Sequence, residues 1–244
     1  KVHVLYCESV DGISWTKYPN PVIYPGGYNS WDSKAVSPGA VIKENGIYKM
    51  YYCGYSDEYI NWHVGYATSV DGINWEKYPQ PIITGTYGWE HQLIPSSIIK
   101  LNNQYYLYYT GRNFPNDRIG LAVSQDGINF TKYSGNPVII NDQAWELSGI
   151  GEGTIQNENG ILRMYYMNSL GTGFGIATST NGINWTKSNL NPFWSPPSAH
   201  SNWAGDQISF PSVVTVNNEV RIYYCGEGPS TYEHRIGMMT RSNN

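Results

Sequence analysis

Four stretches of the chain begin with a tryptophan, and they contain the acidic residues best suited to proton-transfer chemistry. Three copies contain a proline in a β-type run, at Pro38, Pro95 and Pro211, and the remaining copy has Glu152 there. The stretches read W-D-S-K-A-V-S-P-G-A-V-I (31–42), W-E-H-Q-L-I-P-S-S-I-I (89–99), W-E-L-S-G-I-G-E-G-T-I-Q (145–156) and W-A-G-D-Q-I-S-F-P-S-V-V (203–214). A positioned carboxyl group can act as a general acid or base. We therefore interpret Glu152 as the leading catalytic candidate, with a structural bond to backbone amides as the alternative.

Three further acidic residues are candidates for a partner carboxylate, namely Asp32, Glu90 and Asp206. Asp32 and Glu90 directly follow their tryptophans, as Glu146 does, and this recurrence makes them partly architectural. Asp206 has no counterpart of its kind in the other copies. Each of the three is retained as a possible base or as a partner that modulates the pKa of Glu152.

A unit of about 57 residues recurs along the chain. Its landmarks are a turn phrase at Asp11, Asp71, Asp126 and Asn181, double tyrosines at 51–52, 108–109, 165–166 and 223–224, and tryptophans at 31, 89, 145 and 203. A fixed period of this length indicates a repeat architecture. Because a catalytic group is seldom needed several times, we expect the turn-phrase aspartates to be structural, accepting backbone hydrogen bonds beside a glycine of positive φ.

Each unit contains four β-type runs separated by turn signals. In the best-preserved unit they are expected at 36–42, 47–53, 63–69 and around Trp75, with an Asn-Gly hairpin at 45–46. No segment has a sustained 3.6-residue apolar period, so little helix is expected. Four short antiparallel strands per unit are typical of a β-propeller blade, and we predict one all-β propeller domain over residues 1–244.

The two ends of the chain determine the predicted number of blades. The N-terminus supplies a third strand (2–8) and a fourth strand (13–18), and the last unit supplies strands at 210–216, 220–226 and 235–241. Both ends therefore offer a third strand. We predict a five-bladed ring with an incomplete first blade; the alternative is four blades with an irregular closure.

Composition excludes several functional classes. The net charge is -4 and there is no basic run, so nucleic-acid binding has no electrostatic basis. No apolar stretch approaches the roughly 18 residues of a membrane span, and no signal peptide is present; a secreted or periplasmic location is left open. The three cysteines have neither disulfide-framework nor metal-ligand spacing. We expect a monomer without a cofactor, with a structural Ca²⁺ ion or water in the central channel as an open alternative.

The turn phrases A-T-S-x-D-G-I-N-W, the Y-Y-x-G phrases and an acidic residue on an inner strand together resemble the five-bladed glycoside hydrolases. This group includes families 43, 32, 117 and 130, and the resemblance covers practically the whole chain. In families 43 and 32 two aspartates and a glutamate come from separate inner strands. Glu152-Gly153-Thr154-Ile155 resembles the E-G-P motif of the family 43 proton donor, with Thr in place of Pro. The aspartate positions match poorly, since Ser37, Ile94 and Phe210 precede the prolines.

The resemblance implies a glycosidase that acts on a plant or algal oligosaccharide or polysaccharide, with Glu152 protonating the leaving oxygen. The predicted substrate-binding residues are Trp31, Trp89, His91, Gln92, Arg112, Trp145, Gln207 and Glu227. The alternatives are a sugar-binding propeller without catalysis and a propeller that binds only protein.

Overall fold

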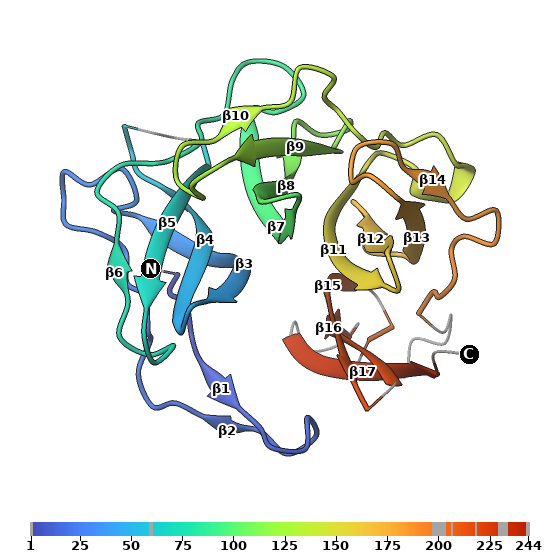
Figure 1. Ribbon diagram of the computed structural model, residues 1–244, viewed down its shortest axis with the longest axis horizontal. Coiled ribbons are helices and arrows are strands. Elements are labelled where there is room, and N and C mark those ends of the chain that lie inside the picture. Colours follow the sequence, from blue (N-terminus) through green and yellow to red (C-terminus); the bar gives the residue numbers. More distant parts are fainter. Residues whose placement is uncertain are drawn as a thin grey trace.

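The computed structural model describes residues 2–58, 61–196, 204–205, 207–217, 219–228 and 234–242. Antiparallel sheets are arranged around a central axis as the blades of a β-propeller (Figure 1), which confirms the predicted all-β class. Among the described residues the helical content is one 3₁₀ turn. The elements are β1 (Cys7–Glu8), β2 (Thr16–Lys17), β3 (Ala35–Glu44), β4 (Ile47–Tyr55), β5 (His63–Ser69), β6 (Glu76–Lys77), β7 (Gln92–Leu101), β8 (Gln104–Arg112), β9 (Arg118–Ser124), β10 (Thr131–Lys132), η1 (Ala144–Glu146), β11 (Ile150–Glu158), β12 (Ile161–Asn168), β13 (Phe174–Ser179), β14 (Thr186–Lys187), β15 (Gln207–Val216), β16 (Glu219–Glu227) and β17 (His234–Ser242).

Three sheets are complete four-stranded blades, β3–β6, β7–β10 and β11–β14. Their strands follow the sequence from the axis outward, as the four β-type runs predict. The first hairpin turns at Asn45 and Gly46, whose φ angles are 50° and 81°. Neighbouring blades bury an apolar core between them; Tyr51 and Leu107, which come from adjacent blades, are both fully buried in one such cluster.

The repeated turn phrase has the structural role expected of it. Asp71 accepts hydrogen bonds from the backbone amides of Ile73 and Asn74, both at 2.8 Å, and Gly72 has a φ of 79°. The Ser69 hydroxyl accepts the Gly72 amide at 2.9 Å. These bonds lower the pKa of Asp71, because they are made to its ionised form. The prediction of a structural aspartate is confirmed.

A tyrosine bond recurs from one sheet to the next. Tyr51 donates to the carbonyl of Gly127 at 2.9 Å, and Tyr108 donates to that of Gly182 at 2.6 Å. Tyr223 of β16 makes the same bond, at 2.9 Å, to Gly12 in the turn between β1 and β2. The turn between β1 and β2 therefore contacts β16 as the turns at Gly127 and Gly182 contact β4 and β8.

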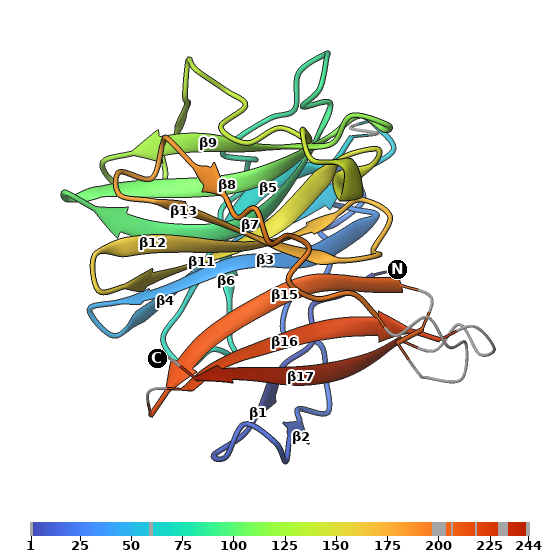
Figure 2. The same ribbon diagram turned by 90° about the vertical axis from the view of Figure 1, so that its right-hand side faces the viewer.

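The first and last repeats form smaller sheets. Strands β15, β16 and β17 run side by side as a three-stranded sheet (Figure 2), and β1 pairs only with β2 in the described part of the chain. A fifth four-stranded blade is thus not formed by the described residues. Leu5 stands at the position that Gly65, Gly120 and Gly175 occupy in the complete blades. At each of these glycines an added Cβ would lie 2.5 Å from a ring atom of the same blade. Leu5 is 70% exposed.

Each inner strand is interrupted by a β-bulge at the same place. The pairing shifts after Ser37 in β3, Pro95 in β7, Gly151 in β11 and Ser209 in β15. Because Gly151 and Ser209 face equivalent residues of the second strands, the next residue, Phe210, is the counterpart of Glu152. The predicted alignment of Pro211 with Glu152 was wrong by one residue, because it matched prolines by residue type, whereas the pairing with the second strand determines which residues correspond.

Candidate functional site

The four bulges line a cavity of about 300 Å³ at the axis of the ring. Pro38, Pro95, Glu152 and Phe210, one from each inner strand, contribute to its wall. Its other lining residues are Ser37, Gly39, Ile94, Ser96, Thr154, Pro211 and Ser212. Glu152 is the only titratable side chain among these described lining residues, which makes it the chemical centre of the cavity.

Glu152 is held in an unusual conformation. Its φ is 53°, and the counterpart Phe210 has a φ of 54°, a left-handed backbone that costs a non-glycine residue of order 1–3 kcal/mol. The Glu152 amide donates to Thr110 Oγ1 at 2.6 Å, and Oε1 accepts from Arg112 Nη2 at 2.5 Å. The other carboxylate oxygen, Oε2, is buried without a hydrogen-bond partner. Such strain is retained where the surroundings impose it, and it recurs at functional sites.

The protonation of Glu152 follows from its surroundings. Burial raises the pKa of the carboxyl above its ordinary value, because the ionised form loses hydration. The guanidinium of Arg112 and the backbone amide of Phe210 oppose this shift, and the negative charge of Asp117 reinforces it. The net direction is upward, which favours a carboxyl that retains its proton and can donate it.

A second cavity of about 340 Å³ lies on the other side of Arg112. It is lined by His91, Gln92, Arg112, Asn113, Phe114, Asp117 and Ser169, so three of the predicted binding residues are brought together there. His91 Nε2 lies 2.9 Å from Asn61 Nδ2, and Phe114 is 68% exposed. Arg112 is the contact between this polar cavity and Glu152.

Asp117 was not among the residues selected from the sequence. It is 5% exposed, and its Oδ2 lies 3.9 Å from Arg112 Nε. A hairpin signal could have found it: β8 ends at Arg112 and β9 begins at Arg118, so Asp117 must return close to Arg112. Phe210 was not among the predicted site residues either, because the sequence alignment placed Pro211 opposite Glu152.

Asp32 and Glu90 do not line either cavity. Asp32 accepts from Tyr52 at 3.0 Å and Lys77 at 2.7 Å. Glu90 accepts from Tyr109 and Lys132, both at 2.8 Å. These tyrosines and lysines belong to the same blade as the acid they contact. Their bonds outweigh burial and lower the pKa of both carboxyls.

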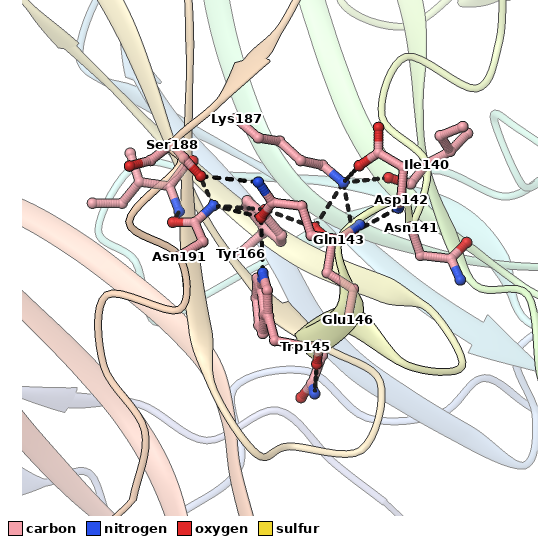
Figure 3. A network of polar contacts seen from close by, with 12 residues as sticks. Ile140, Asn141, Asp142, Gln143, Trp145, Glu146, Tyr166, Lys187, Ser188 and Asn191 are labelled. Carbon is pink, nitrogen blue, oxygen red and sulfur yellow. Dashed lines mark hydrogen bonds and ion pairs between the residues drawn. The ribbon is translucent and has the colours of Figure 1, made fainter.

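Glu146 repeats the arrangement in the third blade (Figure 3). It is fully buried and accepts from Tyr166 at 2.8 Å, from Lys187 at 2.7 Å and from the amides of Asp142 and Gln143. The recurrence of one carboxylate–tyrosine–lysine contact in three blades explains the W-D/E pattern. It gives Asp32 and Glu90 a role in blade architecture.

The three predicted tryptophans pack inside their blades. Trp31 stacks on Tyr52 with ring centroids 5.7 Å apart, and Trp89 and Trp145 pack on the equivalent tyrosines. None lines either cavity. Their rings lie against glycines of their own blades. Contact of these tryptophans with substrate stays a prediction.

Gln207 and Glu227 lie at one end of the last sheet. Gln207 is exposed and pairs with half-buried Glu227 at the β15–β16 edge, and neither lines the two cavities. Asp206 lies outside the described residues. Within the described part of the chain, no group of three His, Cys, Asp or Glu side chains could hold a metal ion, and no helix is long and apolar enough to cross a membrane.

Residues 35–193 match the family model for the glycosyl hydrolases family 32 N-terminal domain. The chain belongs to this family. The match covers the three complete blades, including Glu152 and Arg112. Of the families that the turn phrases resemble, family 32 is thereby shown, whereas the likeness of Glu152 to the family 43 proton donor stays a prediction.

Similar proteins process glycosides. The beta-1,2-mannobiose phosphorylase of Thermoanaerobacter sp. (strain X514) is 27% identical over 138 residues, which are 50% of this chain and 45% of that protein. A structure of a glycoside hydrolase superimposes with a TM-score of 0.78 at 19% identity, over 97% of this chain and 77% of that one. The Bombyx mori GH32 beta-fructofuranosidase gives 0.67 at 18% identity, over 85% and 46%. The matched region spans under half of the phosphorylase, and the structural likenesses show a shared fold.

Proposed function

We propose that this chain forms the catalytic propeller of an enzyme that cleaves glycosidic bonds in oligosaccharides or polysaccharides. Glu152 is the proton donor: its carboxyl gives a proton to the leaving oxygen as the bond from that oxygen to the anomeric carbon breaks, and water or inorganic phosphate from solution forms the new bond to that carbon. The observation that carries this proposal is the unpartnered, buried Oε2 of a strained glutamate in the axial cavity. Membership of the family 32 N-terminal domain family supports it.

The two cavities on either side of Arg112 provide the binding surface for the sugar. Gln92 and Asn113 offer amide groups to sugar hydroxyls in the polar cavity. Phe210 at the axial cavity and Phe114 at the polar cavity are 55% and 68% exposed, and their rings can pack on apolar sugar faces. We further propose, as expected from the sequence, a cofactor-independent, monomeric protein.

A sugar-binding propeller without catalysis is the second candidate. Cleavage by the usual route uses two carboxyl groups that flank the bond, and Glu152 is the single acid among the described residues lining the axial cavity. This observation favours binding without turnover.

We also propose that β1–β2 is the outer half of a fifth blade. The Tyr223–Gly12 bond supports this ring position, since it repeats the contact made by Tyr51 and Tyr108 at complete interfaces. Tyr223→Phe should then destabilise the protein by about 1 kcal/mol, and Tyr108→Phe should destabilise it by somewhat more. An unchanged urea midpoint for Tyr223→Phe would contradict the fifth-blade assignment.

The function is tested with Glu152→Gln and a matched control, Glu76→Gln, at an exposed position of β6. Purified variants are incubated with β-1,2-manno-oligosaccharides, fructo-oligosaccharides and arabino-oligosaccharides, with and without inorganic phosphate, and products are separated by chromatography. We expect cleavage of at least one glycan by the wild type and by Glu76→Gln, and none by folded Glu152→Gln. Binding without cleavage would favour the second candidate, and full activity of Glu152→Gln would overturn the assignment of the proton donor.

A further inference from the structure

One guanidinium is shared by two buried carboxylates from different elements. Arg112, the last residue of β8, places Nη2 2.5 Å from Glu152 Oε1 and Nε 3.9 Å from Asp117 Oδ2. The side chains of Glu152 and Asp117 are 4% and 7% exposed, whereas that of Arg112 is 41% exposed. The cation therefore stands between the acids with one edge open to the polar cavity.

Asp117 is itself firmly placed. Its Oδ1 accepts the backbone amide of Asn113 at 3.1 Å, which closes the loop between β8 and β9. Its carbonyl accepts the amide of Ile150, the first residue of β11, at 3.0 Å. Asp117 thus contacts the strand that carries Glu152 through its backbone and faces Arg112 through its side chain.

The contact between Arg112 and Glu152 uses one side of the carboxylate. A guanidinium is a planar fork that usually grips a carboxylate through two parallel hydrogen bonds. Here Nη2 bonds Oε1, and Glu152 Oε2 has no hydrogen-bond partner. Arg112 Nε lies 3.9 Å from Asp117 Oδ2, which is an ion-pair distance too long for a hydrogen bond, and Nε is also buried without a hydrogen-bond partner. A second bond to Oε2 would occupy the oxygen that the proposed proton donor has to keep free.

We propose that Asp117 is a positioning residue for Glu152: its negative charge, 3.9 Å from Arg112 Nε, attracts that edge of the guanidinium, so that Arg112 bonds only Oε1 of Glu152 and leaves Oε2 free to carry and donate a proton. The inference rests on the proposed function for the use of that proton, and on geometry for the arrangement itself. Asp117 acts through Arg112 and does not contact the reacting atoms.

The negative charge of Asp117 also affects the protonation of Glu152. Arg112 from β8 favours the ionised carboxylate, whereas Asp117, before β9, disfavours it. Cys53 on β4 is a neutral thiol, because burial raises its pKa to about 12. His91 lines the polar cavity beside Arg112. Removing the charge of Asp117 both deletes a repulsive neighbour and releases Arg112 to make a second bond to Glu152. Both changes stabilise the carboxylate.

The test is a titration that needs no substrate. The protein is labelled with glutamate carrying ¹³C at the side-chain carboxyl, the Glu152 signal is identified by its loss in Glu152→Gln, and its midpoint is followed by NMR. Asp117→Asn, which keeps an oxygen to accept the Asn113 amide, should shift the midpoint downward. Arg112→Gln should shift it upward, and Asp117→Glu, which keeps the charge, should change it less than Asp117→Asn does.

An unchanged or raised midpoint in folded Asp117→Asn would overturn the proposal. If that variant fails to fold, Asp117→Ser is used instead, because its hydroxyl can still accept the Asn113 amide. Its Glu152 midpoint is also expected to shift downward, and an unchanged or raised midpoint would overturn the proposal. On any glycan that the wild type cleaves, the alkaline limb of kcat/KM should move to lower pH in Asp117→Asn. If no glycan is cleaved, the proposed function fails while the titration still decides the role of Asp117.

Discussion

Lys187→Met removes the cation from a fully buried carboxylate in the third blade (Figure 3). Lys187 Nζ contacts Glu146 at 2.7 Å and Asp142 Oδ1 at 2.6 Å, and its side chain is 10% exposed. Methionine retains most of the aliphatic stem and therefore the packing. The substitution tests whether the repeated carboxylate–tyrosine–lysine contact holds the outermost strand to its blade.

The expected magnitude follows from burial. Removing one partner of a buried ion pair costs about 3–5 kcal/mol, because the remaining charge is left uncompensated. Tyr166 and two backbone amides still donate to Glu146 after the substitution, so we expect the lower end of this range, about 3 kcal/mol. Lys132→Met should cost less, because the side chain of its partner Glu90 is 14% exposed.

The assay is urea unfolding followed by tryptophan fluorescence, together with a thermal scan. At about 2–4 °C per kcal/mol for a chain of this size, Lys187→Met should lower Tm by about 6–12 °C. The matched control is Lys17→Met, since Lys17 is the corresponding lysine of the first repeat and is exposed on β2. A loss for Lys187→Met no larger than that for Lys17→Met would refute the reasoning.

Two further predictions concern acid stability and close packing. The folded-state pKa of both Asp32 and Glu90 is lowered, so their stabilising contribution is complete above about pH 5 and is lost as pH falls through the folded-state values. The urea midpoint should therefore decline from pH 5 to pH 3, and less steeply in Asp32→Asn; an equal slope would contradict this. Gly120→Ala places a Cβ 2.5 Å from the Tyr109 ring and should cost about 1–3 kcal/mol in urea unfolding, whereas Gly27→Ala, with open space around it, should be neutral. Equal midpoints for the two alanine variants would show that the ring can move aside.

Local chemistry made the blades predictable from the sequence. The turn phrase satisfies its own backbone through Ser69, Asp71 and Gly72, so its meaning does not depend on distant residues. The strands expected at 47–53 and 63–69 correspond to β4 and β5 for the same reason: alternating side chains and turn signals act over a few residues. Repetition then distinguished Glu152 as the departure from the pattern.

The composition of the site was decided by tertiary structure. Glu152 and Arg112 are 40 residues apart and meet because β8 and β11 lie in neighbouring blades. The role of Asp32 in its blade depends on Lys77, which lies 45 residues away in the chain and neutralises the carboxylate. Ion pairing depends on distance in space and on exclusion of water, and neither is encoded in the spacing of residues along the chain.

The sequence by itself determined an all-β repeat, its turns and one exceptional glutamate, because these depend on local hydrogen bonding and periodicity. Only the tertiary structure decided that Phe210 is the counterpart of Glu152, that the tryptophans pack inside the blades, and that Asp117 faces Arg112. Pairing with the second strand determines which residues of two inner strands correspond, and a hairpin loop returns a side chain to its neighbour. Both effects are fixed when the sheets pack against each other around the axis.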